Sequence, residues 1–225
     1  MSFNERFNAY FTRLKPDFNL PPGIEVLYPY SDPEVLTAVQ KFGDRYMNGN
    51  RKRTFLLGIN PGRFGAGVTG ISFTDPVKLN NDLNISNDFE KRGELSSELV
   101  YEMIDHLGGA RNFYRSFYIG SVCPLGFVKN GKNLNYYDDA VLQKTLEPWI
   151  AEQIEDQIKM GARRDCAFSI GKGKNLKFLK TLNERNGWFD RIKTIPHPRW
   201  VMQYRRKQKA EILEDIKAEL LPFMK

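Results

Sequence analysis

The chain has 225 residues, of which 41% are hydrophobic and 13% aromatic. That is enough apolar material for a sizeable core, and too much for a disordered chain. Its apolar runs fall far short of the ~18–20 residues that a membrane span needs, and the first residues lack the apolar stretch of a signal peptide. Two cysteines, Cys123 and Cys166, cannot form a disulfide framework or a four-cysteine metal site. We therefore expect a reduced cytoplasmic protein with one domain over residues 1–225.

The net charge of +7 is unevenly distributed along the chain. Residues 163–209 contain 14 Lys and Arg against 3 acidic residues, a local net charge of +11. A basic segment on a mildly acidic body is typical of a surface that binds a polyanion such as nucleic acid. On charge alone, a solvated surface stripe explains the segment equally well.

Hydrophobic periodicity predicts helices and strands that alternate along the chain. Helical spacing covers residues 3–14 and 32–47, and the apolar run from Arg53 to Ile59 predicts a first buried strand. The long connection from residue 62 to about 96 follows, and connections of that length are usually functional. Further helices are expected at residues 95–107, 138–160, 175–183 and 202–221, and further strands at 117–122, 166–170 and 191–195.

This alternation predicts an α/β fold, a three-layer α/β/α sandwich with a central, mainly parallel four-stranded sheet. In such sheets ligands bind beyond the carboxyl ends of the strands. Each expected strand is followed there by an unusual peptide, namely Asn60-Pro61-Gly62, Cys123-Pro124-Leu125, Gly171-Lys172-Gly173 and His197-Pro198-Arg199. We expect the four peptides to converge on one edge of the sheet.

Taken singly, these peptides allow ordinary structural roles. Gly171 to Lys174 could present backbone N–H groups and two lysines to a phosphate, or form a plain turn between a strand and a helix. His197 is one of two histidines, and a lone histidine is often structural. Asn60 before a proline suits a turn equally well.

Taken together, the peptides resemble the uracil-DNA glycosylase superfamily, most closely the single-strand-selective monofunctional uracil-DNA glycosylases (SMUG). Its first motif is similar to Gly58-Ile-Asn-Pro-Gly-Arg-Phe-Gly65 followed by Thr69-Gly-Ile-Ser-Phe73. Cys123-Pro-Leu125 with Gly131-Lys-Asn133, the glycine peptide at Gly171 and His197-Pro198 match later family segments, in the family's order. After His197 the loop is shorter and carries bulky residues, as expected of a divergent subgroup. That departure leaves open which residue wedges into DNA, and whether single strands are preferred.

The resemblance implies a DNA glycosylase that flips out uracil, or a related damaged base, and hydrolyses its N-glycosidic bond without metal or cofactor. Asn60 would position the attacking water, and His197 would stabilise the leaving base anion. Asn133 and Phe73 would bind the base, and Gly62 would let the backbone approach it. Without the resemblance, Asn133 is an ordinary loop asparagine.

DNA, single- or double-stranded, is the expected partner of a monomeric enzyme. The residues expected to contact it are Gly171, Lys172, Lys174, Arg199, Trp200, Arg205 and Arg206. Trp200 could fill the gap left by the flipped nucleotide or pack in the core, and Arg205 and Arg206 are placed in the first turns of the last helix. Two other hypotheses remain: a non-catalytic nucleic-acid-binding module with the same fold, and a hydrolase of free nucleosides.

Overall fold

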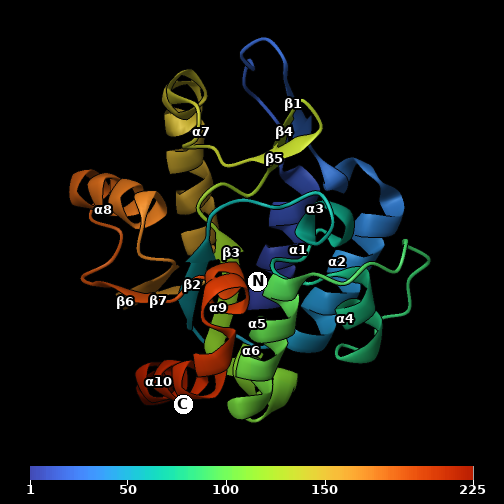
Figure 1. The fold of residues 1–225 in the computed structure, drawn as a ribbon, viewed down its shortest axis with the longest axis vertical. Coiled ribbons are helices and arrows are strands. Elements are labelled where there is room, and N and C mark those ends of the chain that lie inside the picture. Colours follow the sequence, from blue (N-terminus) through green and yellow to red (C-terminus); the bar gives the residue numbers. More distant parts are fainter. Residues whose placement is uncertain (225) are drawn as a thin grey trace.

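The computed structural model describes residues 1–224; residue 225, the last of the expected domain, lies outside this range. Figure 1 shows helices on both sides of a central sheet. The helices are α1 (Phe3–Arg13), α2 (Pro33–Tyr46), α3 (Ala66–Thr69), α4 (Pro76–Asn81), α5 (Leu95–His106), α6 (Gly109–Ser116), α7 (Ala140–Lys159), α8 (Lys174–Asn186), α9 (Pro198–Tyr204) and α10 (Lys209–Leu220). The strands are β1 (Ile24–Leu27), β2 (Arg53–Gly58), β3 (Phe117–Ser121), β4 (Gly126–Lys129), β5 (Lys132–Leu134), β6 (Ala162–Ile170) and β7 (Ile192–Ile195).

The central sheet has the strand order β3-β2-β6-β7, and every neighbouring pair is parallel. The chain winds one way from β2 to β3 and the other way from β3 to β6 and β7, so a switch in winding lies beside β2. Crevices at such switch points are the usual ligand sites of open α/β sheets. The four strands that the sequence predicts are confirmed, and their parallel pairing brings the four peptides after them to one edge.

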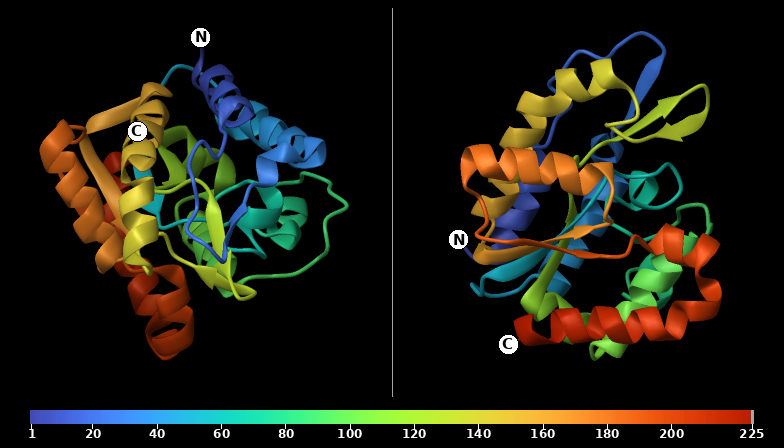
Figure 2. Two further views of the ribbon diagram at one scale, coloured as in Figure 1. Left: turned by 90° about the horizontal axis from the view of Figure 1, so that it is seen from above. Right: turned by 60° about the vertical axis from the view of Figure 1, so that its left-hand side comes forward.

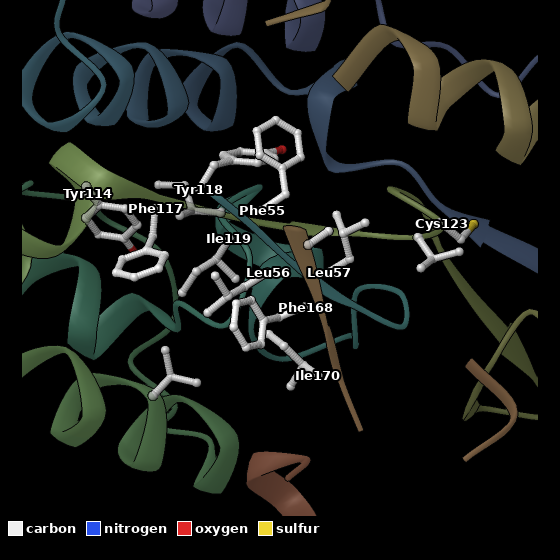
Figure 3. Close-up of a cluster of buried hydrophobic side chains, with 14 of the residues drawn as sticks. Phe55, Leu56, Leu57, Tyr114, Phe117, Tyr118, Ile119, Cys123, Phe168 and Ile170 are labelled. Carbon is white, nitrogen blue, oxygen red and sulfur yellow. The ribbon is translucent and has the colours of Figure 1, made fainter. Parts of the chain in front are cut away.

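Side chains alternate between the two faces of this sheet and build a core on each. Leu56 is in register with Ile119 and Phe168, and Figure 3 shows these three on one side, with Phe55 and Tyr118 on the other. Phe3 and Phe7 of α1 pack against Tyr118 in tilted and edge-to-face contacts, with ring centroids 6.2 and 6.1 Å away. Figures 1 and 2 show α8 and α10 on opposite sides of β6 and β7. The predicted three-layer sandwich is therefore confirmed.

A second, antiparallel sheet of order β1-β4-β5 was not predicted from the sequence. Its strands have only three or four residues, too short for a clear alternating pattern. The hairpin between β4 and β5 turns at Asn130 and Gly131, whose φ angles are +51° and +69°. Asn-Gly is the strongest short hairpin signal, so this turn was open to prediction.

The predicted last helix over residues 202–221 is wrong. Helix α9 begins directly after His197 because Pro198 suits the first position of a helix and the ring of His197 accepts a hydrogen bond from Arg199 N. Arg205 ends α9 with a φ of −133°, and Arg206 lies in a separate 3-10 turn before α10. Arg205 and Arg206 therefore do not share the first turns of one helix.

The amino end of β2 contains a buried cation. Arg53 is 1% exposed and donates to the carbonyl oxygens of Tyr114, Arg51 and Asn48 at 2.7, 3.2 and 3.0 Å. Its guanidinium carbon lies 4.1 Å from the ring centroid of Phe3. Burial lowers the pKa of Arg53 to about 10. This end of the sheet is thus closed by hydrogen bonds.

Both cysteines are buried in the core as free thiols. Burial raises the pKa of Cys123 to about 12, and it also raises the pKa of Cys166. No helix within residues 1–224 is long and apolar enough to cross a membrane.

Candidate active site

Three cavities lie at the carboxyl edge of the central sheet. The central cavity, with a volume of about 240 Å³, is lined by the five residues predicted to act in catalysis and base binding: Asn60, Gly62, Phe73, Asn133 and His197. The lysine cavity, about 420 Å³, is lined by Lys172, Lys174 and Trp200. The arginine cavity, about 430 Å³, is lined by Arg63, Phe64 and Lys132. The structure therefore gathers all the predicted catalytic and base-binding residues around one cavity.

Asn60 follows β2, and the backbone holds its side-chain amide on both sides. Its Nδ2 donates to the carbonyl oxygens of Pro61 and Leu134 at 3.2 and 3.3 Å, and its Oδ1 accepts from Tyr136 N at 3.2 Å. Both amide protons are used, and one lone pair of Oδ1 is left. The amide can therefore still accept one hydrogen bond from a molecule in the cavity.

His197 follows β7 and separates the central cavity from the lysine cavity, since it lines both. Its Nδ1 lies 3.3 Å from Arg199 N, which donates to it, so Nδ1 carries no proton and the neutral ring has its proton on Nε2. Burial, and secondarily the charge of Arg199, lower the pKa of His197 to about 4. At neutral pH the ring is an uncharged donor through Nε2.

Phe73 lines the central cavity, and its ring lies next to Gly58 at the end of β2. Its φ of +53° lies in the left-handed region, which is uncommon for a bulky residue. A Cβ on Gly58 would stand 2.7 Å from the ring of Phe73, so this approach requires glycine at Gly58. The ring centroids of Phe73 and His197 are 6.0 Å apart and the planes are tilted by 58°. Between them they provide two planar walls.

Asn133 enters from β5 and meets the loop after β2. Its Oδ1 accepts from Arg63 N at 3.2 Å, which fixes which end of the amide is the oxygen. Its Nδ2 lies 3.2 Å from the point where a Gly62 Cβ would stand, so Gly62 permits the close approach. The antiparallel sheet that the sequence analysis missed is therefore what carries Asn133 to the site.

Glu94 is a cavity residue that sequence reasoning missed. It lines both the central and the arginine cavity, and its backbone N–H donates to Asp75 Oδ2 at 2.9 Å. Burial and the charge of Asp75 raise the pKa of Glu94, opposed by Arg199 and Arg92. Asp75 also caps α4, and so it anchors the long connection to that helix. One acidic residue in a polar loop has no distinguishing pattern in the sequence.

The lysine cavity lies on the other side of His197. Gly171, Lys172 and Lys174 line it, as predicted, but Gly171 N donates to Ile195 O at 2.8 Å. The expectation that the Gly171 amide is free to bind a phosphate is therefore wrong; that N–H joins β6 to β7. Trp200 is 44% exposed and lines the same cavity, which excludes the alternative that it packs in the core.

The remaining basic residues are more dispersed than the segment suggested. Arg199 lines the central and arginine cavities, whereas Arg205 lies over the Trp200 ring at 5.2 Å and Arg206 lies 4.0 Å from Glu98. Arg185, Lys193 and Lys209 make ion pairs of 2.6–2.7 Å with carboxylates of other elements of the fold. Arg163 pairs at 2.7 Å with Asp165 on its own strand. Part of the basic segment is therefore paired with carboxylates of this chain.

The donors at this edge suit an organic substrate better than a metal ion. Among residues 1–224, no group of three or more His, Cys, Asp and Glu side chains could hold a metal. The central cavity offers a hydrogen-bond acceptor on Asn60, a neutral donor on His197, an amide of fixed orientation on Asn133 and an aromatic wall. This set can bind a planar polar ring and place a water molecule beside it.

A family model and a solved structure both relate the chain to uracil-DNA glycosylases. The family model described as the uracil DNA glycosylase superfamily matches residues 46–220, a range that contains every predicted site residue. The structure is similar to the crystal structure of wild-type SMUG2 from Pedobacter heparinus, with 40% sequence identity and a TM-score of 0.95. That similarity covers 99% of this chain and 98% of that chain. No curated protein matches the chain significantly.

Proposed function

Because the chain belongs to the uracil DNA glycosylase superfamily, we propose that it is a monofunctional glycosylase that excises uracil from DNA. The observation that carries the proposal is the convergence of Asn60, Gly62, Phe73, Asn133 and His197 on the central cavity. Hydrolysis of an N-glycosidic bond passes through a cation-like sugar, and negative charge builds on the departing base. A stacked base is out of reach, so the nucleotide must be flipped into the cavity.

His197 meets the need for a donor to the departing base. Its Nδ1 is occupied by the backbone N–H of Arg199, so Nε2–H is the proton available to a base oxygen. A neutral donor that is already oriented needs no reorganisation as the charge develops. One such donor is typically worth ~2.7–4 kcal/mol of the barrier.

Asn60 meets the need for a positioned water. Its Oδ1 has one lone pair left after the hydrogen bond from Tyr136 N, and a water that donates to it keeps its own lone pair for the anomeric carbon. Because Leu134 O and Pro61 O hold Nδ2, the amide cannot rotate away. Positioning of this kind, rather than strong basicity, is what a neutral amide can contribute.

Asn133 and Phe73 meet the need for selection of the base. With its Oδ1 oriented by Arg63 N, Asn133 can accept from uracil N3–H and donate from Nδ2 to O4. Cytosine reverses both groups and leaves buried polar atoms mispaired, and sites of this kind discriminate by ~10⁴-fold or more. Stacking of the base on Phe73 adds about 1–3 kcal/mol.

DNA reaches the cavity over the basic and aromatic residues around it. Lys172 and Lys174 at the start of α8 face the lysine cavity, where they would hold a phosphate. Trp200 is an exposed aromatic side chain that lines the lysine cavity together with His197, and its position suits the wedge that fills the vacated stack. Arg205, over the ring of Trp200, and Arg206 extend the same surface.

The proposed enzyme removes the base without cutting the strand. No lysine lies among the residues that line the central cavity, so that cavity offers no amine to form a Schiff base with the sugar. We also propose that the enzyme acts on DNA as a monomer in the cytoplasm.

The test is incubation with an oligonucleotide that contains one uracil, in EDTA, with and without subsequent alkali. We expect strand breakage only after alkali, and none with a cytosine oligonucleotide. Breakage without alkali would contradict a monofunctional enzyme. Binding without base release would favour the binding-module hypothesis, and faster release of uracil from free deoxyuridine than from DNA would favour a nucleoside hydrolase.

A further inference from the structure

The arginine cavity is continuous with the central cavity on the side away from His197. The two share Glu94, Ser96, Asn133 and Arg199. The lysine cavity meets the central cavity at Ile59 and His197, and it has no lining residue in common with the arginine cavity. The central cavity therefore lies between two others, so a chain that passes through the site has one neighbour to place on each side.

Phe64 and Arg63 line the arginine cavity, and the guanidinium of Arg92 lies over the ring of Phe64 beside it. The guanidinium carbons of Arg92 and Arg63 lie 3.5 and 4.6 Å from the ring centroid of Phe64. Arg63 also donates through its side chain to Gly131 O in the β4–β5 turn, which fixes it across the loop. Nucleobases stack on such planar cationic and aromatic groups whatever their sequence.

The positive charges in and beside this cavity form no close ion pairs. Within residues 1–224, no carboxylate oxygen lies within 4.0 Å of the side-chain nitrogens of Arg63, Arg92, Lys132 or Arg199. The acidic group in the cavity is Glu94; burial and the charge of Asp75 raise its pKa, and the charges of Arg199 and Arg92 oppose that shift. A cavity lined by three basic residues, Arg63, Lys132 and Arg199, and one acidic residue, Glu94, fits an anionic segment that is continuous with the substrate.

We infer that the arginine cavity binds the nucleotide adjacent to the flipped one on the same DNA strand, on the flank opposite to the nucleotide held by Lys172 and Lys174. Its phosphate would lie between Arg63 and Lys132, and its base would stack on the layer of Arg92 and Phe64. This inference rests on the proposed function, because it assumes that a nucleic-acid strand is the substrate. It adds a second contact region, outside the basic segment that the sequence analysis singled out.

The experiment extends uracil oligonucleotides one nucleotide at a time on either the 5′ or the 3′ flank. The readouts are kcat/KM for uracil release and Kd for the same series with a non-cleavable uracil analogue. The variants are Arg63→Ala/Lys132→Ala, Arg92→Ala and Lys172→Ala/Lys174→Ala. The matched control is Arg51→Ala/Lys52→Ala, two exposed residues before the amino end of β2, at the far edge of the sheet.

For the wild-type enzyme, we expect each nucleotide added on either flank to raise kcat/KM and to lower Kd. In the Arg63/Lys132 and Arg92 variants, the gain in kcat/KM from added nucleotides should be about tenfold smaller on one flank and unchanged on the other. In the Lys172/Lys174 variant, the gain should be reduced on the opposite flank. Because the gain is a ratio within each variant, changes in the chemical step cancel. Thermal unfolding of each variant checks that these exposed substitutions leave the fold intact.

The inference is overturned if added nucleotides benefit the Arg63/Lys132 and Arg92 variants as much as the control variant. It is also overturned if the Arg63/Lys132 and Lys172/Lys174 variants are impaired on the same flank. The proposed function fails separately, if the wild-type enzyme releases no uracil from any oligonucleotide. In that case the binding series still decides whether the arginine cavity contacts a flanking nucleotide.

Discussion

Polar side chains at the two edges of the central sheet differ in how far their hydrogen-bonding atoms are used within the protein. At the amino edge, Arg53 is enclosed and donates to three carbonyl oxygens, with a phenyl ring over its guanidinium. At the carboxyl edge, His197 and Asn133 are each fixed by one backbone N–H and keep their other polar atoms toward a cavity. Every guanidinium nitrogen of Arg53, at the start of β2, thus has a hydrogen-bond partner. The groups gathered at the carboxyl edge, His197 after β7 and Asn133 from β5, keep polar atoms free.

This difference indicates how stability and activity are divided. A buried polar group with all its partners contributes to the free energy of unfolding and cannot bind a substrate. An oriented group with a free atom contributes less to that free energy but can bind a substrate. Asn60 is intermediate, because the backbone uses three of its hydrogen-bonding positions and one lone pair remains. Substitutions at the two edges should therefore separate the two properties.

The sharpest separation is expected for His197→Ala. Loss of the oriented donor should lower the single-turnover rate of uracil release about 10²–10³-fold, while DNA affinity changes only a few-fold and stability by about 1 kcal/mol through the lost helix cap. His106→Ala is the matched control, since His106 lies on α5 and lines none of the three cavities described above. A near wild-type rate in the His197 variant would contradict its catalytic role.

The opposite result is expected at the amino edge. Arg53→Met should lower the free energy of unfolding by about 3 kcal/mol, because the buried carbonyl oxygen of Tyr114 and the partly buried ones of Arg51 and Asn48 lose their donor. The rate of uracil release per folded molecule should stay unchanged. Urea unfolding measures the first and active-site titration the second, and Arg51→Met, at an exposed neighbour, is the control. A stable but inactive Arg53 variant would break the comparison.

Asn60→Ala should affect both properties. Removal of three backbone hydrogen bonds should destabilise the protein by about 1–3 kcal/mol, and loss of the water acceptor should slow uracil release by orders of magnitude. Denaturant unfolding and single-turnover kinetics on the same preparation measure both. If stability is unchanged, the loop after β2 does not depend on this amide, and Asn60 belongs with the free groups.

The pH dependence of His197 distinguishes a neutral donor from a cationic one. Its pKa is about 4 in the fold and about 6.5 when unfolded, so between these values the unfolded chain binds more protons. The stability contributed by the neutral ring is then fully present above about pH 6.5 and is lost as the pH falls through about 4. Nitrogen NMR of the His106→Gln variant, which has His197 as its one histidine, should show a neutral Nε2–H ring down to about pH 5.

Arg199→Gln refines this test. Because the charge of Arg199 is the second cause of the low pKa, the substitution should raise the pKa of His197 toward its ordinary value while burial keeps it low. A titration midpoint near that of an exposed histidine in the unsubstituted background would instead show that the ring is solvated and cationic at mildly acid pH.

The smallest effect is expected at Glu94. Glu94→Gln removes a carboxylate from a cavity that faces phosphates, and so DNA affinity should rise a few-fold. Glu155→Gln, an exposed change on α7, is the control for net charge. Binding of a non-cleavable uracil oligonucleotide at fixed salt measures the difference, and weaker binding would mean that Glu94 makes a favourable contact with the DNA.

The sequence predicted the parallel layer well because its strands are continuous apolar runs followed by conspicuous peptides. Asn60 and His197 were placed by that rule, and the resemblance to the glycosylases singled out Phe73 and Asn133. The resemblance is confirmed by the family match over residues 46–220. The chemical roles of these residues stay predictions until the variants are measured.

What the sequence could not supply depends on contacts between distant segments. Glu94 reaches the cavity because Asp75, 19 residues earlier, holds its backbone N–H, and no periodic pattern encodes that link. The helical pattern over residues 202–221 concealed the break at Arg205. The Gly171 amide, expected to be free, is used because β7 lies beside the end of β6.

The two cysteines have a practical consequence for experiments. Thiol-directed reagents attack thiolates at the surface, and both Cys123 and Cys166 are buried with raised pKa values. We therefore expect the native chain not to react with thiol-directed labels, so that a cysteine introduced at the surface is labelled selectively. A fluorophore attached after Lys132→Cys would report from beside the arginine cavity, and one attached after Tyr204→Cys, at an exposed position of α9, would report from near Trp200. The arrival of DNA at the two sides of the site could then be timed separately, without first removing either native thiol.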